Sequence, residues 1–382
     1  MTQTAEAAFD SVQLFASQKL RPLARELDAE GRFPEELLGE MRSLGLFGLN
    51  YPADIGGGGL DSVASHRILA EIAKASAGVA LTLHVHYMAL DVLLRFGTAE
   101  QKQKYLGKML TGESIAAFTI SEGGAGSDAA AITASARQDG SGWLLSGTKY
   151  FCTNGGLAAL YFVAFKTRPD AGAKGISLFI VEKGVPGFLI GRCEEKMGCR
   201  SSVTTGLVFD NCFVPGENLL GQMDDGFKLA MFGLTGGRLG MSSMGLGIAE
   251  AAMEAAAEYA NKRQAFGKPL TALYAVQEML ADMFVALESS RLVINSAALL
   301  RDSGRDYSLE TSVAKIHVAR AATEICQKAL QVFGGHGYMK HNPVERFARD
   351  ARLMDIGVGT SEVLKMVIGG AVARKYGLKP TG

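Results

Sequence analysis

The chain has 382 residues, of which 20% are charged, and 39 Lys and Arg residues balance 39 Asp and Glu residues. This balance excludes a global positive field that would hold nucleic acid or an anionic membrane. A hydrophobic content of 48% excludes a disordered or collagen-like chain, and the length predicts two or three packed modules.

The cysteines and the lengths of the apolar segments indicate the cellular compartment. The five cysteines are odd in number and contain no C-x-x-C pair, so we expect free thiols in a reducing compartment and neither a disulfide framework nor a zinc site. No basic run followed by an apolar stretch stands near the start, and no uninterrupted apolar segment reaches membrane-spanning length. We therefore expect a cytoplasmic protein with no bound metal, no membrane insertion and no nucleic-acid partner.

The first third of the chain has a helical pattern. An apolar stripe over residues 9–20 predicts one helix, and the Phe-Pro-Glu-Glu sequence at residues 33–36 is typical of a helix start. Two further helices are expected at residues 61–77 and 79–95. The loop at residues 50–59, with four consecutive glycines, is interpreted as a flexible connection without a site.

The middle of the chain changes to a strand pattern. Short runs rich in β-branched and aromatic residues occupy residues 143–151, 160–166, 176–182 and 204–213, separated by Gly, Pro, Asn and Asp. They predict a small antiparallel β domain. No strand–GxGxxG–helix arrangement occurs, so a Rossmann nucleotide-binding domain is not expected.

From Asp224 onward the sequence is again helical and rich in Ala, Met and Leu, which predicts long helices packed closely through small residues. The predicted fold class is α+β. It consists of an N-terminal α-helical domain at residues 1–115, a β domain at 116–222 and a C-terminal α-helical bundle at 223–382.

Four stretches in this order together resemble the acyl-CoA dehydrogenase family of flavoproteins over nearly the whole length. They are FTISEGGAGSD at residues 118–128, KYFCTNGG at 149–156, KRQAFGK at 262–268 and QVFGGHGY at 331–338. One glycine-rich element alone would be weak evidence, but four across the expected changes of secondary structure are specific.

The chemistry of these stretches suits a flavin. The glycines at residues 123–126 let backbone N–H groups approach a ligand, Ser127 adds a hydroxyl donor, and Arg263 can offer two parallel donors to a pyrophosphate. Taken singly, each residue could equally belong to a solvated turn or helix end. The resemblance implies FAD contacts from the following residues: Phe118, Ile120, Ser121, Ser127, Phe151, Thr153, Arg263, Phe266, Gln331, Gly334, Gly335, Thr360 and Glu362.

The resemblance also implies a substrate and partners. The substrate would be an acyl-CoA thioester, and electron-transferring flavoprotein would accept the electrons. The assembly would be a homotetramer, a dimer of dimers, in which a neighbouring subunit supplies the segment around Gln331. Arg238 matches an arginine that opens a long helix beside the CoA portion. The implied substrate contacts are Ser127, Arg238, Tyr87, Gly357 and Val358.

The usual catalytic base of the family is missing. Most members carry a glutamate within Ile-Tyr-Glu-Gly-Thr, whereas residues 356–360 here are Ile-Gly-Val-Gly-Thr, so that Val358 stands in its place. A smaller group of members has a glutamate immediately before the helix-opening arginine, and here that residue is Gly237. Neither residue can accept a proton.

Asp91 is the best candidate for a replacement base. The helical period puts Asp91 one turn beyond Tyr87 and Met88, on a helix that lines the acyl pocket in this family. A partly desolvated carboxylate there would gain basicity. The alternative is an ordinary ion pair between Asp91 and Arg95, one turn later.

The two vacancies also bear on the substrate. Gly357 and Val358 should leave room for a ring, and a relocated base suits a proton acidified through a double bond. The resemblance is strongest to members that convert cyclohex-1-ene-1-carboxyl-CoA to cyclohexa-1,5-diene-1-carboxyl-CoA in anaerobic aromatic and alicyclic metabolism. This reaction would be a 1,4-elimination, with Asp91 as base and hydride transfer to flavin N5.

Other functions stay open at this point. One is 1,2-dehydrogenation of cyclohexane-1-carboxyl-CoA or of another short or branched acyl-CoA, again with Asp91 as base. Another is a non-catalytic protein that binds FAD or acyl-CoA, whose flavin no acyl-CoA would bleach. A third is a flavin monooxygenase on the same fold, against which Arg238 argues.

Overall fold

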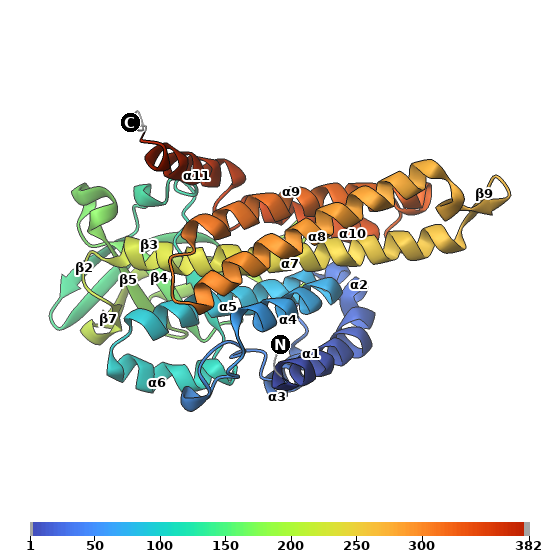
Figure 1. The fold of residues 1–382 in the computed structure, drawn as a ribbon. Helices are drawn as coiled ribbons and strands as arrows, with labels where there is room; N and C mark the ends of the chain where they lie inside the picture. Colours follow the sequence, from blue (N-terminus) through green and yellow to red (C-terminus); the bar gives the residue numbers. More distant parts are fainter. Residues whose placement is uncertain (1–2, 378–382) are drawn as a thin grey trace.

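The computed structural model describes residues 3–377. Helices come before and after the strands in the sequence, and the sheet lies at one end of the molecule (Figure 1). In the first region, the side chain of Asp61 accepts a hydrogen bond from the Ala64 N–H, and Thr98 and Gln101 form a capping box, so both helix starts are fixed locally. The helices of this region are α1 (Gln3–Phe15), α2 (Arg21–Glu30), α3 (Leu38–Ser43), α4 (Ser62–Ala75), α5 (Ala77–Phe96) and α6 (Ala99–Leu110).

The middle region is one sheet in which β6, β7, β3, β2, β4, β5 and β8 follow one another and β1 pairs with β4. Most pairs are antiparallel as predicted, but β1 and β2 both run parallel to β4, so the sheet is mixed. The strands are β1 (Ala116–Thr119), β2 (Ser135–Asp139), β3 (Gly142–Thr153), β4 (Leu160–Lys166), β5 (Ile176–Glu182), β6 (Phe188–Cys193), β7 (Thr204–Pro215) and β8 (Leu219–Leu220).

The strand β4 is buried along its whole length because its two faces join different cores. Leu160, Phe162 and Ala164 pack into the core shared with the helices, whereas Tyr161 and Val163 join a separate core within the β domain. Side chains of a strand alternate between faces, and therefore a strand buried on both sides has a continuous apolar sequence.

The last region is a bundle of long helices that crosses the whole molecule (Figure 1). The longest, α7, packs against α4, α5, α8, α9 and α10. At its far end a two-stranded hairpin, β9 (Gln264–Ala265) and β10 (Lys268–Pro269), projects from the bundle. The helices are α7 (Gly226–Lys262), α8 (Tyr274–Asp302), α9 (Ser308–Phe333), α10 (Val344–Ile356) and α11 (Ser361–Lys375).

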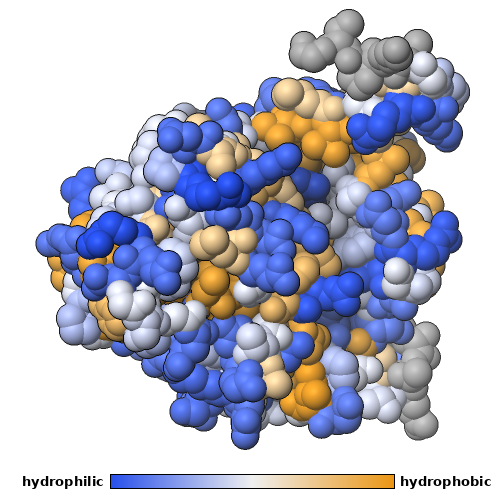
Figure 2. Space-filling model, turned by 90° about the vertical axis from the view of Figure 1, so that its left-hand side faces the viewer, coloured by the Kyte–Doolittle hydropathy of each residue, from blue (hydrophilic) through white to orange (hydrophobic). Residues whose placement is uncertain are grey.

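The view from the β-domain end shows a mostly hydrophilic face with separate apolar areas (Figure 2). Two helices, α5 and α8, are long and apolar enough to cross a membrane by length and composition, which the sequence analysis did not anticipate. In α5 the apolar surface is used inside the protein, since 83% of its most apolar window is buried. For α8 only 33% of the window is buried, so this helix presents an apolar face outward.

Candidate active site

A buried ion pair anchors the glycine-rich loop that begins after β1. The carboxylate of Glu122 accepts hydrogen bonds from the Lys149 ammonium at 2.7 Å and from the backbone N–H groups of Thr133 and Ala134. Lys149 is completely buried, and burial lowers its pKa to about 8 despite the bond to Glu122. The loop itself is open, since a Cβ added at Gly124 or Gly126 would meet nothing within 4 Å.

A bulge in β3 displays Phe151 beside this loop. The pairing of β3 with β7 is interrupted between Lys149 and Cys152, and Tyr150 instead donates its backbone N–H to the Ser121 carbonyl. Phe151 has a φ of +56° and a ring that is 69% exposed. An apolar side chain in a strained backbone conformation and open to solvent is typical of a ligand site.

Several other predicted cofactor residues lie around this bulge. Phe118 and Ile120 are buried beneath it, and the Ile120 carbonyl accepts a hydrogen bond from Lys149. Ser127 is exposed on the loop, and Thr153 is half-buried at the end of β3. These residues fit the ring and phosphate portion of a flavin.

A second group of predicted cofactor residues lies far from the first, at the opposite end of the bundle. Phe118 packs near Gly233 in α7, whereas Arg263 caps the other end of this helix. Thirty helical residues at 1.5 Å each separate these positions by about 45 Å. The second group is exposed and consists of Arg263, Phe266, Gln331, Gly334 and Gly335. One chain therefore does not bring both groups to one ligand.

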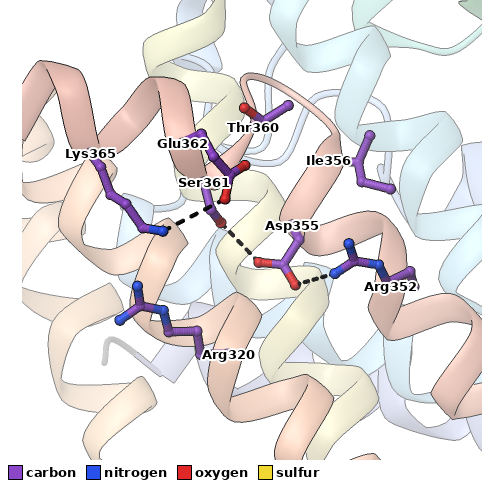
Figure 3. Close-up of a pocket in the computed structure, with 8 residues that line it drawn as sticks. All are labelled: Arg320, Arg352, Asp355, Ile356, Thr360, Ser361, Glu362 and Lys365. Carbon is purple, nitrogen blue, oxygen red and sulfur yellow. Dashed lines mark hydrogen bonds and ion pairs between the residues drawn. The ribbon is translucent and has the colours of Figure 1, made fainter.

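Thr360 and Glu362 line a polar pocket of about 230 Å³ between α9, α10 and α11 (Figure 3). Thr360 is the N-cap of α11, its hydroxyl oxygen accepts the Val363 N–H, and its side chain also hydrogen-bonds to Glu362. Glu362 pairs with Lys365 at 3.6 Å. Arg320 and Arg352 also line this pocket, but Arg352 pairs with Asp355 at 2.8 Å, so the pocket has charges of both signs.

The two positions that carry the base in other family members meet in this fold. A Cβ added at Gly237 would lie 2.9 Å from both the Val358 Cγ1 and the Met88 Sδ. A Cβ at Gly357 would lie 2.6 Å from the Met241 Cε. The extra room expected here is thus filled by methionines, whose flexible ends can yield to a ligand.

Asp91 lies next to this apolar contact and is held by two donors. Its Oδ1 accepts hydrogen bonds from the Tyr51 hydroxyl and from the Arg301 guanidinium, both at 2.9 Å. Its Oδ2 lies 3.1 Å from the same Arg301 nitrogen. The side chain is 11% exposed. The partner of Asp91 is therefore Arg301 of α8, and not Arg95 as the alternative interpretation held.

Close packing against α7 fixes the carboxylate. A Cβ added at Gly236 would lie 2.7 Å from the Asp91 Oδ2, and one at Gly240 would lie 2.4 Å from the His84 Nδ1. Tyr87, one turn before Asp91, lines a small cavity together with Asp91, and its hydroxyl donates to the Leu46 carbonyl. His66 and His84 line this cavity too. Larger residues on α7 would push Asp91 and His84 out of place.

Three family models match consecutive parts of the chain: the N-terminal, middle and C-terminal domains of acyl-CoA dehydrogenase, at residues 2–113, 117–212 and 224–373. The chain belongs to the acyl-CoA dehydrogenase family. It is thus a flavin-dependent oxidoreductase that acts on acyl-CoA, and FAD is its cofactor.

Individual relatives support the assignment. The mitochondrial short-chain specific acyl-CoA dehydrogenase of Mus musculus is 42% identical over 95% of this chain and 88% of its own. The structure of butyryl-CoA dehydrogenase from Megasphaera elsdenii has a TM-score of 0.96 at 38% identity, over 98% of this chain and 99% of that one. A structure described as electron transferring flavoprotein of Acidaminococcus fermentans also has a TM-score of 0.96 at 38% identity, over 98% of this chain and 99% of that one.

Arg238 differs from the expectation for this acyl-CoA dehydrogenase. It does not open a helix, because α7 begins at Gly226 and continues past it. Its guanidinium is buried, with one long hydrogen bond of 3.4 Å to the Ser312 hydroxyl and a buried Nε that has no partner among the described residues. Burial lowers its pKa. A buried cation with so little compensation suits an anionic or strongly polar ligand atom.

Two residues beside Asp91 were missed from the sequence. Tyr51 belongs to the loop that was interpreted as a flexible connection, yet it is buried because Gly57 and Gly58 pack directly on the backbone of Tyr51 and Leu49. Arg301 lies 210 residues from Asp91 in the chain, so no local pattern connects them. In the sequence, the run of four glycines was the feature that could have indicated a closely packed loop around Tyr51.

Proposed function

We propose that this acyl-CoA dehydrogenase converts cyclohex-1-ene-1-carboxyl-CoA to cyclohexa-1,5-diene-1-carboxyl-CoA by 1,4-elimination, with Asp91 as the base. The proposal rests on one observation. The positions of both usual bases, Gly237 and Val358, contact each other and methionine in an apolar environment, while the adjacent Gly236 contacts the Asp91 Oδ2. The Asp91 carboxylate belongs to α5 and faces α7 at Gly236, the residue before Gly237.

The geometry of Asp91 suits proton removal by Oδ2. Tyr51 and Arg301 both donate to Oδ1, whereas Oδ2 has only the 3.1 Å contact to Arg301. A carboxylate oxygen has room for about two hydrogen-bond donors. Oδ2 therefore keeps capacity for a proton, and the fixed partners hold it in one orientation.

The proposed reaction removes one proton and one hydride from the ring. In a 1-ene thioester the γ-carbon proton is acidic through the double bond, and Asp91 would accept it while the C–H electron pair enters an extended dienolate. Bound FAD would supply the acceptor for the hydride that leaves the ring's second β-carbon, on the side away from the double bond. The exposed Phe151, the open glycine loop and the hydroxyl of Thr153 are the residues that would hold the cofactor ring.

Anaerobic bleaching of the holoenzyme tests this function. The panel contains cyclohex-1-ene-1-carboxyl-CoA, cyclohexane-1-carboxyl-CoA and butyryl-CoA, and the product is identified by mass spectrometry and NMR. The proposal expects the fastest bleaching with the cyclic enoyl thioester and formation of the 1,5-diene. Faster bleaching by butyryl-CoA, with crotonyl-CoA as product, would reject it.

A second candidate is 1,2-dehydrogenation of a saturated short-chain, branched or cyclic acyl-CoA, also with Asp91 as base. The relatives named for short-chain and butyryl-CoA substrates favour it. So do Met88 and Met241, which fill space near the missing bases. The same panel separates the two candidates, because only the second predicts turnover of saturated thioesters.

We also propose a cytoplasmic homotetramer, a dimer of dimers, that passes electrons to electron-transferring flavoprotein. Separation of the two groups of cofactor residues supports a site shared between subunits. Exposed Val285, Leu292 and Leu299 recur every seven residues on α8, which gives this helix an apolar face for a second copy. The fold shared with a structure described as electron transferring flavoprotein supports the electron acceptor. Size measurement in solution and reduction of that flavoprotein test these points.

A further inference from the structure

The turn between α10 and α11 has a strained backbone. It joins Ile356, the last residue of α10, to Thr360, which precedes α11 (Figure 3). Inside the turn, Val358 has a φ of +57° and Gly359 has a φ of +94°. Glycine tolerates the left-handed region, but a β-branched residue in it is an outlier. Such a conformation persists only where the surrounding structure holds it.

Packing against α7 holds part of this turn. The Val358 Cγ1 lies 2.9 Å from the place that a Cβ at Gly237 would take. The Met241 Cε lies 2.6 Å from the place that a Cβ at Gly357 would take. Apolar packing is non-directional, so it does not fix the direction in which the carbonyl groups of the turn point.

Lys315 of α9 supplies a directional contact to the turn. Its ammonium donates a hydrogen bond of 2.7 Å to the Gly359 carbonyl, and the residue is only 1% exposed. This is the one hydrogen bond that the ammonium makes within residues 3–377, although it can donate three. A buried cation with so few partners costs stability relative to an apolar side chain. Stability alone therefore gives no reason for a lysine at this position.

Charged groups on three neighbouring helices act on this ammonium. Asp355 of α10 and Glu362 of α11 favour its charged form, whereas Arg238 of α7 opposes it. Burial has the largest influence, and the combined result is that the pKa of Lys315 is lowered to about 8. The ammonium is thus mainly protonated at pH 7 and loses its charge as the pH rises through 8.

We propose that Lys315 is a positioning residue of the acyl-CoA site, whose ammonium holds the Gly359 carbonyl and thereby orients the turn that carries Val358. The inference rests on the proposed function in one respect, the place of Val358 beside the acyl group, and it does not require Asp91 to be the base. Lys315 acts through the backbone of the turn and does not touch the reacting atoms. Because a hydrogen bond from a charged donor is about twice as strong as a neutral one, the turn should loosen when the ammonium loses its proton.

Steady-state kinetics of the holoenzyme with butyryl-CoA and with cyclohex-1-ene-1-carboxyl-CoA, at pH 7 and pH 9, test this role. In Lys315→Met an apolar side chain of similar length replaces the buried ammonium, a change that folded proteins commonly tolerate. We expect KM for the thioester to rise about tenfold at pH 7, with a smaller change in kcat and unchanged flavin content. Between pH 7 and pH 9 the wild type should lose affinity, and Lys315→Met should lose less.

Two further variants make the result specific. Lys166→Met removes another buried ammonium, which donates to the Gly172 carbonyl in a loop without predicted site residues, and it should follow wild type at both pH values. Lys315→Arg keeps a charged donor at pH 9 and should lose less affinity there than wild type. Equal losses in these two proteins would reject the role even if the methionine variant does not fold. Lys149, whose pKa is also about 8, is present throughout and cancels from the comparison.

The outcomes separate the role of Lys315 from that of Asp91. If Lys315→Met keeps the wild-type KM and pH dependence while Asp91→Asn abolishes bleaching, the positioning role is wrong and the base assignment stands. If Asp91→Asn bleaches normally and Lys315→Met raises KM, the base assignment fails and the positioning role stands. A crystal structure of the Lys315→Met holoenzyme adds a direct readout: Val358 is expected to leave the left-handed region, and an unchanged φ would overturn the inference.

Discussion

Two sides of one segment of α7 differ sharply in chemistry. On one side, Gly237 faces Met88 and Val358, and the contact contains no ionisable group; on the other, Gly236 faces Asp91, Arg301 and the Tyr307 hydroxyl. Adjacent helical residues point about 100° apart, so one step in sequence separates an apolar contact from a charged cluster. If Asp91 is the base as proposed, the comparison teaches that a proton acceptor can move to the next face of α7 while the fold stays the same.

Both sides are tightly packed, but their neighbours differ. A Cβ at Gly236 would strike the Asp91 carboxylate, which Tyr51 and Arg301 hold in place, whereas a Cβ at Gly237 would strike the side chains of Met88 and Val358. Cores resist displacement of fixed polar groups more than displacement of a methionine. Substitutions on the two sides should therefore have unequal effects.

Asp91→Asn should have the largest effect. Loss of a general base typically lowers the rate by about 10²- to 10⁴-fold, and the isosteric amide leaves the packing of Gly236 nearly unchanged. We expect kcat with the best thioester to fall by this amount at unchanged flavin content, measured by steady-state kinetics and absorbance. Retained turnover with full flavin content would show that the charged side is structural.

Gly236→Ala should come next. The added methyl group would lie 2.7 Å from the Asp91 Oδ2, and displacement of a catalytic group by about 1 Å can cost roughly a hundredfold in rate. We expect kcat to fall more than KM changes. Gly369→Ala in α11, where a Cβ meets nothing within 4 Å, is the matched control and should keep full activity. Equal activities of the two variants would contradict the packing argument.

A carboxylate can be returned to the apolar side. In the Asp91→Asn background, Val358→Glu puts an acid at the position that most family members use. We expect turnover of butyryl-CoA to rise about tenfold above the single variant, with little gain on the cyclic enoyl thioester, because the new base faces the α-carbon. A gain limited to the cyclic substrate would mean that carboxylates at residues 91 and 358 reach the same carbon of the substrate.

A separate prediction concerns stability, which should depend on pH on the charged side. Burial lowers the pKa of His84 from 6.5 to about 4, so the unfolded chain binds this proton more tightly than the folded protein. The contribution of neutral His84 to the free energy of unfolding is complete above pH 6.5. It is lost as the pH falls toward 4, by up to about 3 kcal/mol.

Urea unfolding of wild type and His84→Gln at pH 7 and pH 4.5 measures this term. The variant should lose less stability on acidification than wild type does. Exposed His341→Gln serves as a control that should follow the wild-type curve. Parallel curves for all three proteins would argue that His84 is hydrated in the folded state.

Much of the fold was predictable because local patterns and tertiary packing agree. The run at residues 160–166 was predicted as a strand and forms β4 with the same bounds, since β-branched and aromatic residues there suit burial on both faces. The expectation that Arg238 opens a long helix was wrong, because α7 begins at Gly226. Four of the seven glycines in α7, at residues 233, 236, 237 and 240, pack on α5, and this close packing outweighs their poor helical propensity.

The candidate site was only partly predictable. The helical period predicted that Asp91 and Tyr87 share one side of a helix, and both line one small cavity. That this side faces the acyl group stays a prediction. The partners of Asp91 come from a loop and from a helix 210 residues away. Residues such as Arg263 and Gln331 lie at the far end of the bundle. A helical pattern within one chain cannot predict which part of a second subunit they would contact.

The sequence by itself determined the family, the order of helices and strands, and the absence of an acid at residues 237 and 358, because motifs, periodicity and side-chain chemistry are properties of the chain alone. Only the tertiary structure decided that these two positions touch, that Arg301 and Tyr51 hold Asp91, and that two histidines line the cavity behind it. Contacts between distant segments depend on how helices pack against one another, and that arrangement follows from the burial of the whole chain.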